Sequence, residues 1–186
     1  MTDSRRAGWR RRAVVLPVLG MVLVLAAAAA FWFEPWKLVV DSTVAEPAPS
    51  AAVAGPAVEA GRAVGAALAG PVVVARGTLV THEHATTGEA VLLRLPDGSH
   101  VLRLEDLTTS NGPRLKVWLT DAPVVPGRAG WYLFDDGRHL DLGDLKGNLG
   151  SANYPIPPGT DLTGLTSVSI WCERFAVSFG AAPLVA

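Results

Sequence analysis

Cys172 is the only cysteine among the 186 residues, and its thiol is the group in the sequence best suited to redox chemistry. A cysteine reacts as its thiolate, which a nearby cation favours and apolar surroundings disfavour. In a straight strand Arg174 would share a face with Cys172 and favour the thiolate, whereas Val168 and Ile170 place the cysteine on an apolar face. Two interpretations therefore stay open: a redox or ligating thiol modulated by Arg174, and a small buried hydrophobe.

The alternation of apolar residues around Cys172 changes phase at Glu173 and Arg174. Apolar residues occupy even positions before this point and odd positions from Phe175 onward. A two-residue hairpin turn requires residues suited to positive φ, and Glu-Arg supplies none. The pattern predicts a β-bulge, or a strand buried on both faces, with Cys172 at a break in the strand pairing.

Histidines are the other candidate ligands in the sequence. His82 and His84 would share one face of an extended segment and could offer two nitrogens to a metal, although a solvated strand end explains the same pattern. The only methionines, Met1 and Met21, precede the predicted domain, so an axial methionine ligand is excluded there. With no Cys-x-x-Cys-His motif, the options are no cofactor or a non-covalent group, and cofactor-binding residues are not identified.

Sequence motifs of hydrolases and phosphate-binding enzymes are missing from the chain. It contains no Gly-x-Ser-x-Gly, no His-Glu-x-x-His and no phosphate-binding glycine loop. The chain after the N-terminal arginines is mildly acidic and has no basic stripe, which argues against nucleic acid as a partner. These features favour a redox or electron-transfer component over a hydrolase or transferase.

Residues 72–186 show the pattern of an all-β domain. Short apolar runs alternate with turn residues at spacings of about ten, which is typical of a single β-sandwich or barrel-like domain, here with about 7–9 short strands. Residues 141–159, rich in Gly, Asn and Pro, are expected to form a long shaped loop. Strands are expected at 77–82, 88–95, 99–104, 114–120, 138–142, 166–173 and 174–180.

The N-terminal part has the composition of a membrane anchor. Residues 13–33 contain no charge and, at about 1.5 Å per residue, would span a hydrocarbon core of roughly 30 Å. Five arginines within residues 1–12 predict a cytoplasmic N-terminus, and Phe31, Trp32 and Phe33 would form an aromatic belt. We therefore expect a single-pass cell-membrane protein with its β domain extracytoplasmic; a cleaved signal peptide is the alternative.

Residues 34–71 are expected to be a flexible linker. The stretch from residue 41 is rich in Ala, Pro and Gly and has no aromatic residue, so it offers too little apolar area to offset the entropy of ordering it. It would act as a tether between the helix and the domain.

Five short segments between residues 102 and 175 occur in an order that resembles the DM13 domain family. In this family the domain is β-rich and extracytoplasmic, and the resemblance implies a membrane-anchored protein of bacterial type. Leu107 and Arg114 depart from the family pattern, where Phe and an acidic residue are common, but the cysteine position is retained. The similar segments are 102–107, 111–113, 140–147, 153–157 and 168–175, followed by Phe179, Gly180 and Leu184.

The resemblance implies electron transfer through the single cysteine, which Cys172 matches. The thiol would act alone or as a ligand to a non-covalent group such as haem, and it would need a redox partner protein. The alternative is a non-enzymatic cell-surface binding or structural module in which Cys172 is buried and inert.

Overall fold

A computed structural model describes residues 3–38, 40–50 and 70–186. It contains two compact units, Met1–Lys37 and Leu38–Ala186. The first consists of helix α1 (Asp3–Phe33), followed by the 3-10 helix η1 (Pro35–Leu38). Within α1, Val15–Phe33 is long and apolar enough to cross a membrane, because no charged side chain interrupts it and Pro17 lies near the start of this stretch.

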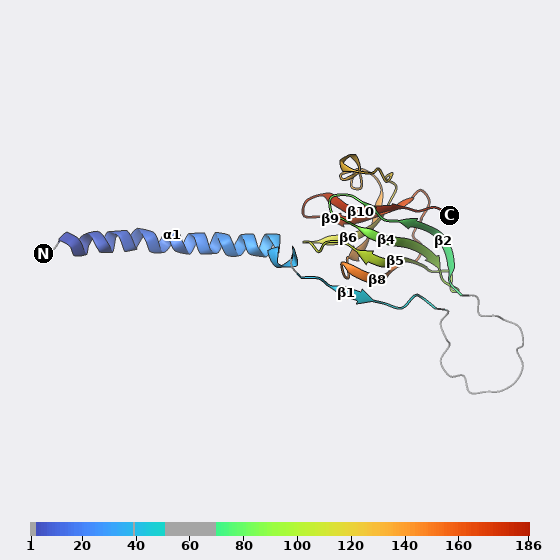
Figure 1. Ribbon diagram of the computed structural model, residues 1–186, viewed down its shortest axis with the longest axis horizontal. Helices are drawn as coiled ribbons and strands as arrows, with labels where there is room; N and C mark the ends of the chain where they lie inside the picture. Colours follow the sequence, from blue (N-terminus) through green and yellow to red (C-terminus); the bar gives the residue numbers. More distant parts are fainter. Residues whose placement is uncertain (1–2, 39, 51–69) are drawn as a thin grey trace, which may run out of the picture. The chain divides into compact units, whose positions relative to one another are not determined.

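The second unit is a sandwich of two five-stranded sheets (Figure 1). The fold class predicted from the sequence is confirmed, with ten strands where about 7–9 were expected. One sheet has the order β1 (Thr43–Ala45), β8 (Leu149–Ile156), β5 (His100–Thr108), β4 (Thr87–Arg94), β2 (Val72–Thr78). The other has the order β3 (Val80–Thr81), β10 (Val177–Pro183), β9 (Ser167–Cys172), β6 (Leu115–Thr120), β7 (His139–Asp144).

The main core lies between the two sheets and is built by alternating side chains. Leu102 and Leu104 of β5 and Val168 and Ile170 of β9 are fully buried in it. The other face of β9 is also covered, because Trp171 packs with Phe134 and Trp118 in a second apolar cluster. Every residue of β9 is therefore buried, as one of the two alternatives for this strand predicted.

Strand β8 lies where the sequence predicted a long loop. Its even-numbered residues Ala152, Tyr154 and Ile156 are buried against the core, and it pairs with β5 on one side and β1 on the other. The Gly and Pro content obscured this alternation. Pro155 is exposed, and Asn153 binds the chain beside β1 through its side chain, so both residues are compatible with the strand.

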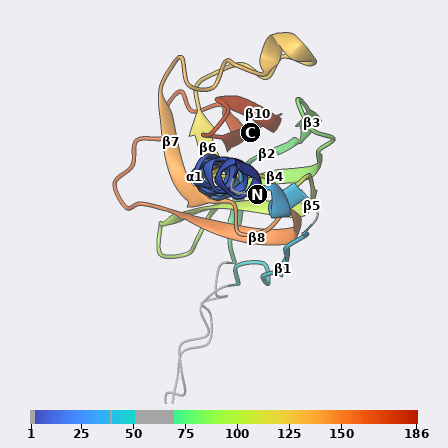
Figure 2. The ribbon, with the colours of Figure 1, turned by 90° about the vertical axis from the view of Figure 1, so that its left-hand side faces the viewer.

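Strand β1 lies within the stretch expected to be a flexible linker, which is wrong for residues 41–47. Thr43–Ala45 pairs in parallel with Leu149–Ser151 and extends the first sheet (Figure 2). Polar contacts, which the amino-acid composition does not reveal, stabilise the docking of β1 on the sheet. Glu46 accepts bonds from Lys146 Nζ at 2.8 Å and from the Asn153 amide at 2.7 Å, and Arg103 donates to the carbonyl oxygen of Pro47 at 3.2 Å. The rest of the expected linker includes residues 51–69, which lie outside the described residues.

Candidate functional site

A four-residue hairpin turn, Glu173–Ala176, joins β9 to β10 directly after Cys172. The predicted break in pairing at Cys172 is wrong, since Cys172 pairs with Leu115 of β6 and with Val177 of β10. The prediction was wrong because it excluded a two-residue turn at this point and did not consider a longer one. A four-residue turn with Ala176 at a φ of 48° reverses the chain without Gly or Asn and accounts for the change of phase. The bulge in this hairpin lies further on, between Ser178 and Gly180.

Cys172 is fully enclosed at the end of β9. Its exposed fraction is 0%, and its Sγ donates a hydrogen bond to the carbonyl oxygen of Pro113 at 3.3 Å. Burial raises the pKa of the thiol above its ordinary value, and the backbone N–H groups of Phe175 and Arg174 oppose this only in part. In this conformation the cysteine is a protonated thiol and a core residue.

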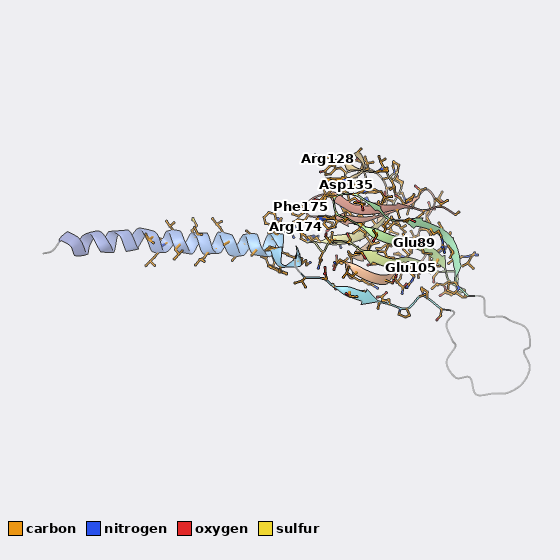
Figure 3. All side chains as sticks on the ribbon, in the orientation of Figure 1. Glu89, Glu105, Arg128, Asp135, Arg174 and Phe175 are labelled. Carbon is orange, nitrogen blue, oxygen red and sulfur yellow. The ribbon has the colours of Figure 1, made fainter. Side chains whose placement is uncertain are left out.

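Arg174 lies in the hairpin turn, half-buried, and its neighbour Phe175 is at the same end of the domain (Figure 3). The expected effect of its charge on Cys172 has the predicted sign, because it lowers the pKa of the thiol, but burial outweighs it. The negative charge of Glu83 acts in the opposite direction and raises that pKa. The arginine therefore does not make Cys172 a stable thiolate here.

An aromatic pocket of about 280 Å³ adjoins Cys172. Three residues next to the cysteine also line this pocket: Pro113 accepts its hydrogen bond, Val177 pairs with it across the hairpin, and the amide of Phe175 donates to its carbonyl oxygen at 3.3 Å. The thiol lies behind the pocket lining. The other lining residues are Glu83, His84, Trp131, Tyr132 and Phe179.

The backbone of Ser178 holds two walls of the aromatic pocket in place. Its N–H donates to the carbonyl oxygen of Trp131 at 2.8 Å, and its carbonyl oxygen accepts from the Glu83 amide at 3.1 Å. The bulge between Ser178 and Gly180 leaves Phe179 as the extra residue of β10, and bulges commonly redirect a side chain in this way. The ring of Phe179 lies 3.9 Å from that of His84.

His82 and His84 do not converge on a metal. His84 lines the aromatic pocket, and its Nε2 lies 2.6 Å from Glu83 Oε2. His82 is buried, and its Nδ1 is hydrogen-bonded to Ser178 Oγ at 2.9 Å, while Ser169 Oγ donates to the same hydroxyl at 3.0 Å. Across the described parts of the chain, no three His, Cys, Asp or Glu side chains form a metal-binding group.

The geometry around Cys172 does not fit haem ligation. The sulfur is directed to the carbonyl oxygen of Pro113, and no part of the residue is exposed. A pocket of about 280 Å³ lies below the range of roughly 300–1,000 Å³ usual for drug-sized ligands, and a porphyrin is larger than these. An iron atom bound to this sulfur would require the core to open.

The sequence singled out Cys172 and Arg174 for redox chemistry and His84 as a possible metal ligand, but it did not predict the aromatic lining of the pocket. Trp131 and Tyr132 follow the 3-10 helix η2 (Arg128–Gly130), outside every predicted strand. Phe175 is 51% exposed and Tyr132 is 48% exposed. The sequence did contain a signal for this surface, because Trp131 and Tyr132 are adjacent aromatic residues in a stretch without strand periodicity.

A family model described as "Electron transfer DM13" matches residues 78–184, from the end of β2 almost to the C-terminus. The match includes Cys172 and every residue that lines the aromatic pocket. Comparison with curated proteins and with solved structures gives no match.

Proposed function

This chain belongs to the DM13 family, described as electron transfer, and from that premise we propose that it is a membrane-tethered, extracytoplasmic domain that exchanges electrons through Cys172. The observation that carries the proposal is the shared lining: Pro113, Phe175 and Val177 contact or pair with the cysteine and also face the pocket. A displacement of these residues would bring the thiol to solvent.

The chemistry that fits a single thiol without a cofactor is exchange with a disulfide of a partner protein. Cys172 loses its proton to solvent, and its sulfur attacks one sulfur of the partner disulfide. That disulfide bond breaks, a mixed disulfide forms, and the leaving sulfur takes the electron pair and then a proton. A second partner, a dithiol donor, then attacks the Cys172 sulfur with one thiolate, which breaks the mixed disulfide and releases the first partner as a dithiol. The other thiolate of the donor attacks the donor sulfur bound to Cys172, so the donor leaves as a disulfide and Cys172 takes up a proton as a free thiol. Disulfide partners are common outside the cytoplasm.

Access to Cys172 requires local opening of the hairpin turn. The turn is at the surface, with Phe175 half exposed, whereas β9 itself is buried along its whole length. Segments with few buried contacts open at a smaller free-energy cost than core strands. We therefore assign the gating movement to Glu173–Ala176 and the adjoining Pro113.

Alkylation of the native protein tests this gate. The full chain, in a maltoside detergent, is treated with iodoacetamide, and the modified fraction is followed by mass spectrometry. Phe175→Ala should accelerate modification about tenfold, which corresponds to about 1.4 kcal/mol less opening free energy. Tyr132→Ala, which removes an equally exposed pocket residue that does not adjoin Cys172, is the matched control. If every variant is modified only at its rate of global unfolding, the hypothesis that local opening of the hairpin turn exposes the thiol is wrong.

We also propose that α1 anchors the domain with its N-terminus in the cytoplasm. Its support is the apolar length of Val15–Phe33 and the five arginines that precede it. Because β1 belongs to the sandwich, residues 34–42 connect the helix to the domain, which is much shorter than the tether expected from the sequence. Mature protein that begins near Phe31 would show instead that the segment is a cleaved signal peptide.

Complete burial of Cys172 and the raised pKa of its thiol favour a second candidate function, a cell-surface binding module with an inert cysteine. In that case the exposed pocket aromatics make the functional contacts. A Cys172→Ala variant separates the two functions. An electron-transfer domain with this substitution loses exchange with small disulfides, whereas a binding module still binds its partner through the pocket aromatics.

A further inference from the structure

We propose that the aromatic pocket binds a small organic cation of the quaternary ammonium class. The site is independent of redox chemistry at Cys172 and would persist if that chemistry were absent. The proposal rests on the combination of aromatic rings and one carboxylate around a small pocket.

Five rings line the pocket and come from three separate segments of the chain. His84 follows β3, Trp131 and Tyr132 follow η2, and Phe175 and Phe179 belong to the β9–β10 hairpin. The faces of Trp, Tyr and Phe rings, four of the five here, carry partial negative charge, and a cation within about 6 Å of such a ring centroid is attracted to it. Cages of such rings are the usual protein sites for quaternary ammonium groups.

Glu83 supplies the one acidic side chain of the pocket lining. Its Oε2 lies 2.6 Å from His84 Nε2, so the carboxylate is held in position at the edge of the pocket. Among the residues that the structure describes, no Lys or Arg lines the pocket. The pocket therefore has the charge and surface that complement an apolar cation.

The lining favours a quaternary ammonium over a primary amine. A primary ammonium is strongly hydrated and needs several hydrogen-bond acceptors when it leaves water. The only charged acceptor here, Glu83, is already bonded to His84, and most of the remaining side chains are aromatic or aliphatic. A quaternary ammonium donates no N–H hydrogen bond, and its methyl groups can contact the rings directly.

The protein already places a cation of its own against one of these rings. The guanidinium carbon of Arg128 lies 5.9 Å from the centroid of the Trp131 ring. The Trp131 ring therefore already takes part in one cation–π contact. The backbone bonds of Ser178 fix the backbone positions of Trp131 and Glu83 without a ligand, which reduces the entropy lost on binding.

Titration of the full chain with choline tests the site. The protein is held in a maltoside detergent and phosphate buffer, because phosphocholine detergents and amine buffers would compete. Saturation-transfer NMR follows the N-methyl protons of choline, and calorimetry gives the affinity. The neutral isostere 3,3-dimethylbutan-1-ol is the matched ligand control, since it has the same shape without the charge.

We expect choline to bind at least about tenfold more tightly than the neutral isostere. Glu83→Gln, which removes the charge, and Tyr132→Leu, which removes a ring but keeps apolar area, should each weaken choline binding at least about threefold. Glu89→Gln, an exposed acid on β4 outside the pocket, should have no effect. Equal affinity for both ligands, no choline signal at 10 mM, or equal loss in the Glu89 control would each overturn the proposal.

A second arm distinguishes free choline from a lipid headgroup. Vesicles of phosphatidylcholine and of phosphatidylglycerol are offered to the full chain in nanodiscs of phosphatidylglycerol. Protection of Phe175 and Tyr132 from hydroxyl-radical labelling by phosphatidylcholine vesicles, lost on addition of choline, would identify the headgroup as the source. Protection by choline with none from vesicles would identify the free cation; either source supports a quaternary ammonium site.

Discussion

Cys172 and Pro113 share a hydrogen bond that joins the core to the wall of the aromatic pocket. The sulfur donates to the Pro113 carbonyl oxygen at 3.3 Å, and Pro113 itself faces the pocket. The bond holds the thiol proton on a fully enclosed sulfur, so the reactivity of this cysteine depends on whether Pro113 and the hairpin turn move.

The raised pKa of Cys172 predicts a loss of stability at alkaline pH. The folded state keeps the thiol proton to higher pH than the unfolded chain, whose single thiol ionises near pH 8.5. Above that pH the unfolded state is favoured increasingly, and Cys172→Ala should remove this part of the pH dependence. Urea unfolding at pH 7, 8.5 and 10 measures it. If the free energy of unfolding depends on pH in the same way in Cys172→Ala and in the native protein, the native state does not bury a protonated thiol.

Replacement of Cys172 should reduce stability through packing. Cys172→Ala leaves a small cavity between Leu115 and Val177, at a cost of about 1–2 kcal/mol. Cys172→Ser keeps a donor for the Pro113 carbonyl oxygen but places a hydroxyl among apolar groups, which costs about 1–3 kcal/mol. Denaturant midpoints at pH 7 measure both variants. Stability equal to that of the native protein in both would mean that the sulfur is not tightly packed.

His82 makes the domain sensitive to acid. Burial lowers the pKa of this side chain below its ordinary 6.5, although a hydrogen bond to the backbone of Val125 opposes the shift. The unfolded chain binds the proton first, so stability is complete above about pH 6.5 and decreases as the pH falls below that value. His82→Gln should cost stability at pH 7 by disturbing the bond to Ser178, yet lose less between pH 7 and pH 5. Thermal unfolding at the two pH values compares them.

Docking of β1 can be tested at Gly147. A Cβ there would lie 2.5 Å from the Ser42 carbonyl oxygen and 2.6 Å from Val44 Cγ2. Gly147→Ala should displace β1 and leave the backbone of β8 exposed as an edge, which promotes association. Faster amide exchange at residues 149–151 and concentration-dependent scattering would report this. Gly70→Ala is the matched control, because an added Cβ there meets no atom within 4 Å and the backbone has no positive φ, and it should leave exchange at β8 unchanged.

Much of the fold could be predicted because alternation is a local property. Val168, Ile170 and Cys172 have the period of a strand, and the structure places all three in the core. The same rule failed at β8, where Asn, Gly and Pro are accommodated by pairing on both sides, and at β1, whose order depends on Lys146, Asn153 and Arg103 far along the chain. Contacts between residues distant in sequence are not encoded in local composition.

By itself the sequence determined the all-β class, the apolar N-terminal segment and the presence of a single cysteine within the segment that matches the family. Only the tertiary structure decided the state of that cysteine, since its enclosure depends on Leu115, Val177 and Pro113, which meet at β9 through sheet pairing and a loop. It also decided that aromatic residues from three segments form one pocket. Charge, burial and ring geometry at a site depend on neighbours in space, and the neighbours of Cys172 and Phe175 are set by how the two sheets pair and stack.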